Sequence, residues 1–167
     1  SGLVRWSREG EPVVPHLAKS WEISSDYREY TFHLRRGMRW SDGAPFTAAD
    51  LEYWYENEVK YFDVVPQVLR DGKDRGRLEK IDDYTVKFVF SEPNVLFLQR
   101  LASAATLPEP VFSDYCLPSH YLRRYHPKLG DQALIAELMS ELRLASPRAL
   151  YQELKRFRNP HHPRLWP

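Results

Sequence analysis

Two aspartates at short spacing are the first residues of this 167-residue chain that could do chemistry. Asp42 and Asp50 could be paired carboxylates, which act together as general acid and base in many hydrolases. However, Asp42 precedes a glycine in a turn-forming pair, and Asp50 follows a threonine at the spacing of a helix cap. Carboxylates at such positions bind backbone amides. We therefore expect structural roles for both aspartates.

The remaining chemical candidates are a histidine pair and one thiol. His161 and His162 are adjacent, so both rings rarely reach one metal ion, and no second ligand pair lies at a useful spacing. Cys116 is the only cysteine, which excludes an internal disulfide. A nucleophilic thiolate needs a base and an electropositive setting, so a buried thiol is expected. The sequence predicts no catalytic residue, no metal ligand and no cofactor, and hence no enzyme.

Charge and hydropathy narrow the classes of partner. Lys and Arg number 24 against 23 Asp and Glu, so the net charge of +1 gives no general attraction to nucleic acid. The basic run Arg70–Arg77 contains acids, which favours a solvated loop over a nucleic-acid site. No apolar run approaches the roughly 20 residues that span a bilayer, so no transmembrane segment is predicted.

The elements that would position these residues centre on residues 30–50. Tyr30, Phe32 and Leu34 alternate with polar residues, which predicts a strand with one buried face. Gly37 and the Asp42-Gly43 pair then interrupt the run. Thr47 with Asp50 three positions later predicts a capping box at a helix start. This stretch is therefore expected to form a strand, a turn and a helix.

The rest of the chain predicts an α+β fold with a small, largely antiparallel sheet packed with helices. A helix after Thr47 would bury Trp54, and Trp40 is also expected in the core. Residues 60–77 have the composition of a solvated loop, and the C-terminal third is expected to be helical. The strands of one sheet are expected near Leu3, Trp21, Tyr30, Leu78 and Tyr84. A short helix is expected after Asn94 as its cap, with an apolar side formed by Val95, Leu96, Leu98 and Leu101. Further helices are expected to begin at Pro118, Asp131 and Ser146.

A single domain over 1–167 is expected, with a sheet-rich part at 1–105 and a helical extension at 106–167. The apolar residues near both ends suggest that this domain is excised from a longer chain. Several motifs then resemble one family in their order along the sequence. They are Pro15-His-Leu-Ala18, Ser20-Trp21, Tyr30–Arg35, Trp40-Ser-Asp-Gly43, Pro45–Ala48 with Asp50, Ile81–Val86, Ser91-Glu-Pro93 and, in the C-terminal part, Pro118–Leu122 and His126-Pro127.

These motifs resemble the family 5 extracellular solute-binding proteins, the oligopeptide and dipeptide receptors of ABC importers. The resemblance implies the smaller inserted domain of a two-lobed periplasmic-binding-protein type II clamp, which captures peptides or similar small solutes with the flanking lobes and without chemistry. It further implies an ABC importer permease as partner and an extracytoplasmic location, either periplasmic or as a membrane-anchored lipoprotein. An alternative is a sensor or interaction module of a regulator that reuses this domain.

By its place in the motif order, the resemblance also implies which segments approach a ligand. They are Tyr61 with Phe62, and Ala102, Ser103 and Ala104 after the short helix. Aromatic and small residues suit a roomy peptide pocket. The alternative, ordinary loop and packing residues, remains open. The turn at Ser24–Arg28 lacks the glycine that family members often carry, which predicts a looser turn.

Overall fold

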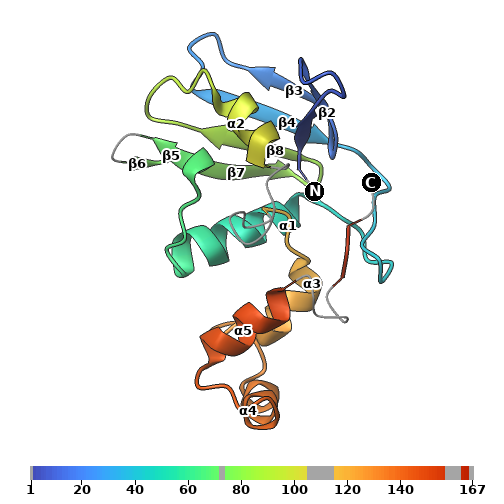
Figure 1. The fold of residues 1–167 in the computed structure, drawn as a ribbon, viewed down its shortest axis with the longest axis vertical. Helices are drawn as coiled ribbons and strands as arrows, with labels where there is room; N and C mark the ends of the chain where they lie inside the picture. The colour runs from blue at the N-terminus through green and yellow to red at the C-terminus, as the bar shows by residue number, and fades with distance from the viewer. Residues whose placement is uncertain (1, 72–73, 105–114, 157–162, 166–167) are drawn as a thin grey trace. The chain divides into compact units, whose positions relative to one another are not determined.

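The computed structural model describes residues 2–71, 74–104, 115–156 and 163–165 (Figure 1). Within it the chain forms two compact units. The sheet unit contains the chain up to Met38 and Phe46–Leu117, and the helical unit contains Arg39–Pro45 and Pro118–Trp166. The predicted single domain with a division at residues 105 and 106 stays a prediction, because that boundary falls outside the described residues.

The main sheet has four antiparallel strands in the order β3-β4-β8-β7 (Figure 1). The two predicted hairpins are confirmed: β3 pairs with β4 and β7 pairs with β8. The central pair is β4 with β8, in which Phe32 lies opposite Val86. The strand bounds are Ala18–Ile23 for β3, Glu29–Leu34 for β4, Arg77–Asp82 for β7 and Thr85–Val89 for β8.

The first predicted strand does not join this sheet, which corrects the sequence-based expectation. β1 (Val4–Trp6) pairs with β2 (Val13–Pro15) in a separate two-stranded sheet. The turn between them, closed by the Gly10 amide donating to the Ser7 carbonyl, folds β2 back onto β1. The backbone groups of β1 therefore pair with the neighbouring β2 and not with a strand of the main sheet.

Aromatic rings fill the core of the sheet unit. The predicted alternation on β4 is confirmed, since Tyr30, Phe32 and Leu34 are each no more than 1% exposed. α2 (Phe97–Ala104) covers this face (Figure 1). The Phe97 ring of α2 packs among these aromatic side chains. Edge-to-face and tilted ring pairs of this kind add stability beyond the buried area. The Phe97 ring centroid lies 4.8 Å from Tyr30, 4.8 Å from Phe90, 5.1 Å from Phe88 and 6.4 Å from Phe32.

The predicted capping box is confirmed at the start of α1 (Ala48–Trp54). The Thr47 side chain accepts from backbone amides of the first turn, and the Asp50 carboxylate accepts from the Thr47 amide at 3.1 Å. Trp54 at the end of α1 is 1% exposed and Trp40 is 3% exposed, so both predicted core positions are confirmed. The helix then continues as a π-helix, η1, over Tyr55–Tyr61.

Two further expectations for the sheet unit are wrong. Residues 60–77 are not one loop, because they contain η2 (Gln67–Leu69) and the short strands β5 (Arg70–Asp71) and β6 (Asp74–Arg75). Val95 and Leu96 do not line the core, since they are 56% and 53% exposed. α2 begins only at Phe97, so the helical register buries Phe97 and Leu101 instead.

The helical unit confirms the predicted helices of the C-terminal third. The Asp131 carboxylate accepts from two amides at the start of α4, and the Ser146 hydroxyl accepts from one at the start of α5, which has a proline in its first turn. The segment Arg39–Pro45 joins this unit through Ser41, whose amide donates to the Arg164 carbonyl at 2.7 Å. The helices are α3 (Ser119–Leu122), η3 (Arg123–Tyr125), α4 (Gln132–Glu141) and α5 (Pro147–Lys155).

Candidate functional site

The first predicted ligand segment lies where η1 ends. The Phe62 amide donates to the Asn57 carbonyl at 3.1 Å, and Asp63 then takes a left-handed backbone conformation with φ of 55°. This sharp end leaves Tyr61 46% exposed while Phe62 is 8% exposed. The two rings meet edge to face with centroids 4.9 Å apart. Tyr61 is therefore an exposed aromatic ring held by a buried neighbour.

The second predicted segment lies at the C-terminal end of α2. Ala102 is fully buried, Ser103 is half-buried, and the side chain of Ala104 lies outside the described part of the chain. The Ser103 hydroxyl accepts a hydrogen bond from the Trp6 indole nitrogen at 3.1 Å. α2 also packs against β1 and η2. Small side chains at this end of α2 allow that close packing.

Trp6 is the neighbour of this segment that the sequence did not single out. It lies on the same face of β1 as Val4, which is fully buried, yet the Trp6 side chain remains half-buried. The bond to Ser103 fixes the orientation of its indole ring. Its only sequence signal is period-2 spacing from Val4, because its partner lies 97 positions away in the chain.

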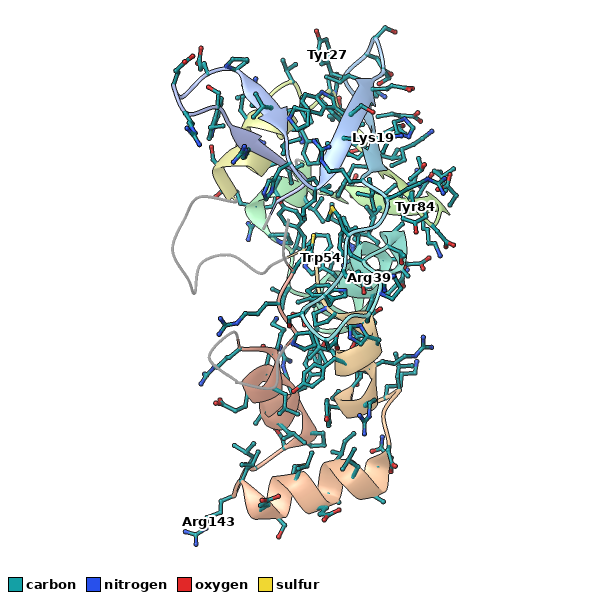
Figure 2. All side chains as sticks on the ribbon, turned by 90° about the vertical axis from the view of Figure 1, so that its right-hand side faces the viewer. Lys19, Tyr27, Arg39, Trp54, Tyr84 and Arg143 are labelled. Carbon is teal, nitrogen blue, oxygen red and sulfur yellow. The ribbon has the colours of Figure 1, made fainter. Side chains whose placement is uncertain are left out.

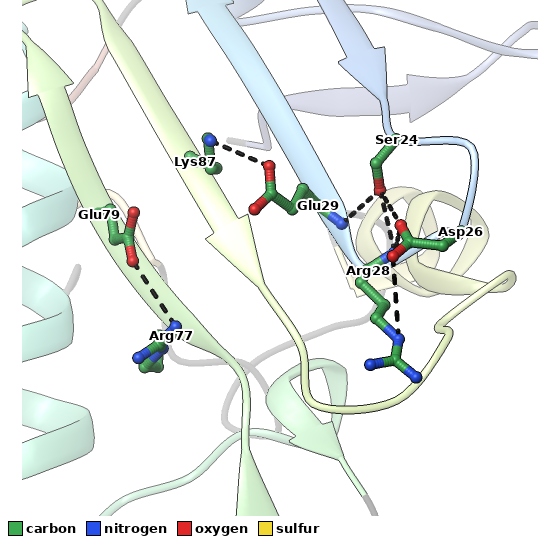
Figure 3. Close-up of polar contacts among 7 residues, drawn as sticks. All are labelled: Ser24, Asp26, Arg28, Glu29, Arg77, Glu79 and Lys87. Carbon is green, nitrogen blue, oxygen red and sulfur yellow. Dashed lines mark hydrogen bonds and ion pairs between the residues drawn. The ribbon is translucent and has the colours of Figure 1, made fainter.

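The outer face of the main sheet carries charges that pair with one another (Figure 3). Lys87 on β8 donates to the Glu29 carboxylate on β4 at 3.0 Å, which raises the pKa of the lysine. On β7, Arg77 and Glu79 are 3.9 Å apart. Cross-strand pairs of opposite charge stabilise a sheet modestly. This face is a solvated surface with its charges mutually satisfied.

The turn that precedes β4 replaces the missing glycine with Tyr27, whose φ is 57° (Figure 2). The turn is closed rather than loose: the Tyr27 amide donates to the Ser24 carbonyl at 3.0 Å. The Ser24 hydroxyl donates to the Asp26 carboxylate at 2.6 Å, and this bond, followed by one from the Arg28 amide, lowers the pKa of Asp26 (Figure 3). The expectation of a looser turn is therefore wrong.

The two candidate acid-base aspartates have separate structural partners. Asp50 caps α1, whereas the Asp42 carboxylate accepts from the Nε2 atom of His120 at 2.7 Å within the helical unit. Burial raises the pKa of Asp42, but the hydrogen bonds from His120 and the Ala44 amide outweigh it and lower the pKa overall. The structural interpretation of both residues is the one that the geometry supports.

Cys116 is buried, with 5% of its surface exposed. In the described ranges no group of three or more His, Cys, Asp and Glu side chains is placed to hold a metal ion, and His161 and His162 lie outside those ranges. The helices among the described residues are all too short or too polar to cross a membrane.

Residues 12–132 match a family model described as "Bacterial extracellular solute-binding proteins, family 5 Middle". The periplasmic alpha-galactoside-binding protein of Rhizobium meliloti strain 1021 is 38% identical over 125 residues, which cover 71% of this chain and 16% of the relative. The periplasmic oligopeptide-binding protein OppA of Escherichia coli K12 is 33% identical over 126 residues, which cover 65% of this chain and 23% of OppA.

Solved structures agree with these relatives. An oligopeptide-binding protein OppA superimposes with a TM-score of 0.81 and 36% identity over 97% of this chain and 24% of that protein. The periplasmic binding protein MelB of Agrobacterium fabrum C58, solved with stachyose, gives a TM-score of 0.61 and 32% identity over 78% of this chain and 20% of MelB. The chain thus spans about a sixth to a quarter of the length of these proteins.

Proposed function

This chain belongs to the bacterial extracellular solute-binding proteins of family 5, and on that basis we propose that it is part of the solute receptor of an ABC importer. In this role it captures peptides or similar small solutes reversibly and catalyses no reaction. The observation that carries the proposal is the match to OppA over 97% of the chain with a TM-score of 0.81.

The same match supports a specific place for the chain in a larger receptor. It corresponds to 24% of the OppA structure, which is the size of an accessory domain. We propose that it is the inserted domain of a hinged two-lobed clamp, and that lobes outside this chain hold most of the solute. Hinge closure is the usual way in which periplasmic binding proteins enclose a ligand.

The proposed contribution of this chain is one wall of the solute site, made by Tyr61, Phe62, Ala102, Ser103 and Ala104. The exposed Tyr61 ring, supported by Phe62, offers an amphipathic contact for a solute. Ala102 is buried, so its role is to keep α2 close to its neighbours rather than to touch the solute. Trp6 extends the wall through its bond to Ser103.

The proposed partners and location follow from the receptor role. The receptor would deliver solute to the permease of an ABC importer, and it would work outside the cytoplasm, either in the periplasm or as a lipoprotein anchored to the membrane. The names of similar proteins include binders of oligopeptides, of dipeptides and of alpha-galactosides. Peptides or small carbohydrates are therefore the solutes to test.

The test is isothermal calorimetry on the receptor that carries this chain, titrated with a mixed peptide library and with raffinose-type oligosaccharides. Tyr61→Ala should weaken binding by about 5-fold to 30-fold, since removing one aromatic contact costs about 1–2 kcal/mol. Tyr27→Ala is the matched control, because Tyr27 is also exposed (43%) but lies on the β3–β4 turn.

The two levels of the proposal fail in different ways. A folded receptor that binds neither class of solute contradicts the receptor function. A receptor that binds solute equally well with Tyr61→Ala and with Tyr27→Ala keeps the function and removes Tyr61 from the wall.

A further inference from the structure

A buried histidine lies at the centre of the helical unit. His126 follows η3 and is 1% exposed, a degree of burial that histidine reaches less often than the apolar residues do. Its ring meets Tyr151 of α5 edge to face, with centroids 5.5 Å apart and planes at 85°. Tyr151 is itself fully buried. His126 thus joins the turn after η3 to the inner face of α5.

The Nδ1 atom of His126 accepts two backbone hydrogen bonds. The donors are the amide of Lys128 at 3.2 Å and the amide of Leu129 at 3.3 Å. An imidazole nitrogen accepts only when it carries no proton, so this arrangement requires the neutral ring with its proton on Nε2. If Nδ1 carried a proton, its N–H group would point at the two amide N–H groups, and neither hydrogen bond could form.

The same turn fixes the start of α4. The Gly130 amide donates to the His126 carbonyl at 2.8 Å, and the Asp131 amide donates to the Arg124 carbonyl at 3.1 Å. Asp131 then caps α4 through its carboxylate. A Cβ atom at Gly130 would clash with the Arg124 carbonyl oxygen, so the turn is closed tightly. A change at the His126 ring is therefore passed directly to α4.

The charged and titratable groups around the ring do not favour its cation. Burial, and then the positive charge of Lys128, lower the pKa of His126 below the usual histidine value. The Asp131 carboxylate already accepts from the amides of Ala133 and Leu134. Tyr151 on α5 presents a neutral ring.

We propose that His126 is an acid-sensitive lock of the helical unit, and that protonation of its Nδ1 atom opens the turn at residues 126–130 and releases α4 from α5. The lock does not depend on the solute-binding role proposed above. A histidine with a depressed pKa in the closed state makes the open state take up more protons once the pH falls below about 6.5. The closed state therefore has its full stability above that pH and loses it progressively as the pH falls further.

The test is amide hydrogen exchange of the full chain between pH 7.5 and pH 4.5, with rates corrected for the intrinsic effect of pH. Protection of α4 and α5 should fall by up to about tenfold per pH unit below the usual histidine pKa. Protection of β4 and β8 serves as the internal reference. His126→Asn should remove this pH dependence, because its Oδ1 atom accepts hydrogen bonds near the place of Nδ1 at every pH.

His120→Asn is the matched control for a second histidine of the same unit. His120 is exposed and bonded to Asp42, so its replacement should leave the acid response of α4 and α5 in place. NMR titration of the His126 ring in the unmodified protein keeps the proposal testable if His126→Asn does not fold. A ring that takes up its proton without loss of α4 protection would overturn the proposal, as would an acid response that persists unchanged in a folded His126→Asn.

Discussion

The sheet unit and the helical unit are stabilised in different ways. The sheet unit surrounds Phe97 with four aromatic rings and joins its strands by antiparallel pairing. The helical unit depends on satisfied backbone groups: caps at Asp131 and Ser146, and a turn closed around His126. Its described apolar residues that are buried are fewer, namely Trp40, Leu122, Ile135, Leu150 and Tyr151.

This difference indicates which substitutions each unit tolerates. A core built from interdigitating rings loses stability mainly when volume is removed. A unit held by a few closed turns loses stability mainly when a backbone group loses its partner or its space. The family match reaches from residue 12 to residue 132, so α5 and nearly all of α4 lie beyond it. The two units therefore differ in family coverage as well as in how they are held.

The largest expected effect is the loss of a ring from the sheet unit. Phe97→Ala should lower the free energy of unfolding by about 3–5 kcal/mol, because it leaves a cavity among rings that cannot collapse together. Urea unfolding followed by near-ultraviolet circular dichroism measures this change. Val95→Ala is the control, since Val95 is 56% exposed and should change stability by less than about 0.5 kcal/mol. Equal effects would contradict the ring-centred core.

A smaller loss is expected from the turn of the helical unit. Gly130→Ala should cost about 2–3 kcal/mol, because the new methyl group meets the Arg124 carbonyl and the backbone must shift. The helical signal in far-ultraviolet circular dichroism during thermal unfolding reports it. Gly10→Ala has open space at its Cβ but a φ of 92°, so it should cost only about 1 kcal/mol from backbone strain. A Gly130→Ala protein as stable as the unmodified chain would show that the turn is loose.

The smallest effect is a gain at the β3–β4 turn. Tyr27→Gly should raise stability by about 0.5–1 kcal/mol, because glycine adopts the left-handed conformation without the steric cost that Tyr27 bears. Differential scanning calorimetry would show a higher melting temperature. Tyr27→Ala keeps the strained conformation and should bring no gain. If both variants gain equally, exposure of the tyrosine ring rather than backbone strain limits the turn.

Local patterns predicted much of the fold. The strands of the main sheet, the Thr47 capping box and the helix starts at Asp131 and Ser146 were correct, because each depends on residues within a few positions. Val95 and Leu96 were misplaced because their apolar character did not reveal where α2 begins. β1 was assigned to the main sheet because alternation identifies a strand but not its partner.

The contact roles of the candidate site residues stay predictions. Tyr61 is exposed, as a contact residue would be, whereas Ala102 is buried. Trp6 was missed because its partner, Ser103, is brought to it only by the packing of β1 on α2. Similarly, His126-Pro127 belongs to the family-like motifs of the sequence, but local sequence does not indicate that its imidazole closes a backbone turn.

The sequence by itself determined the α+β class, the strand pairs joined by short turns, the helix caps and the family, since these depend on periodicity, turn chemistry and ordered motifs. The tertiary structure decided which of the apolar residues near α2 are buried and which strand pairs with β1. It also decided that the Trp6 indole donates to the Ser103 hydroxyl and that the His126 ring is neutral. Those features arise from contacts between segments far apart in the chain or from burial by several elements at once. Local spacing indicates which face of a strand or helix can be buried, but not which distant segment covers that face.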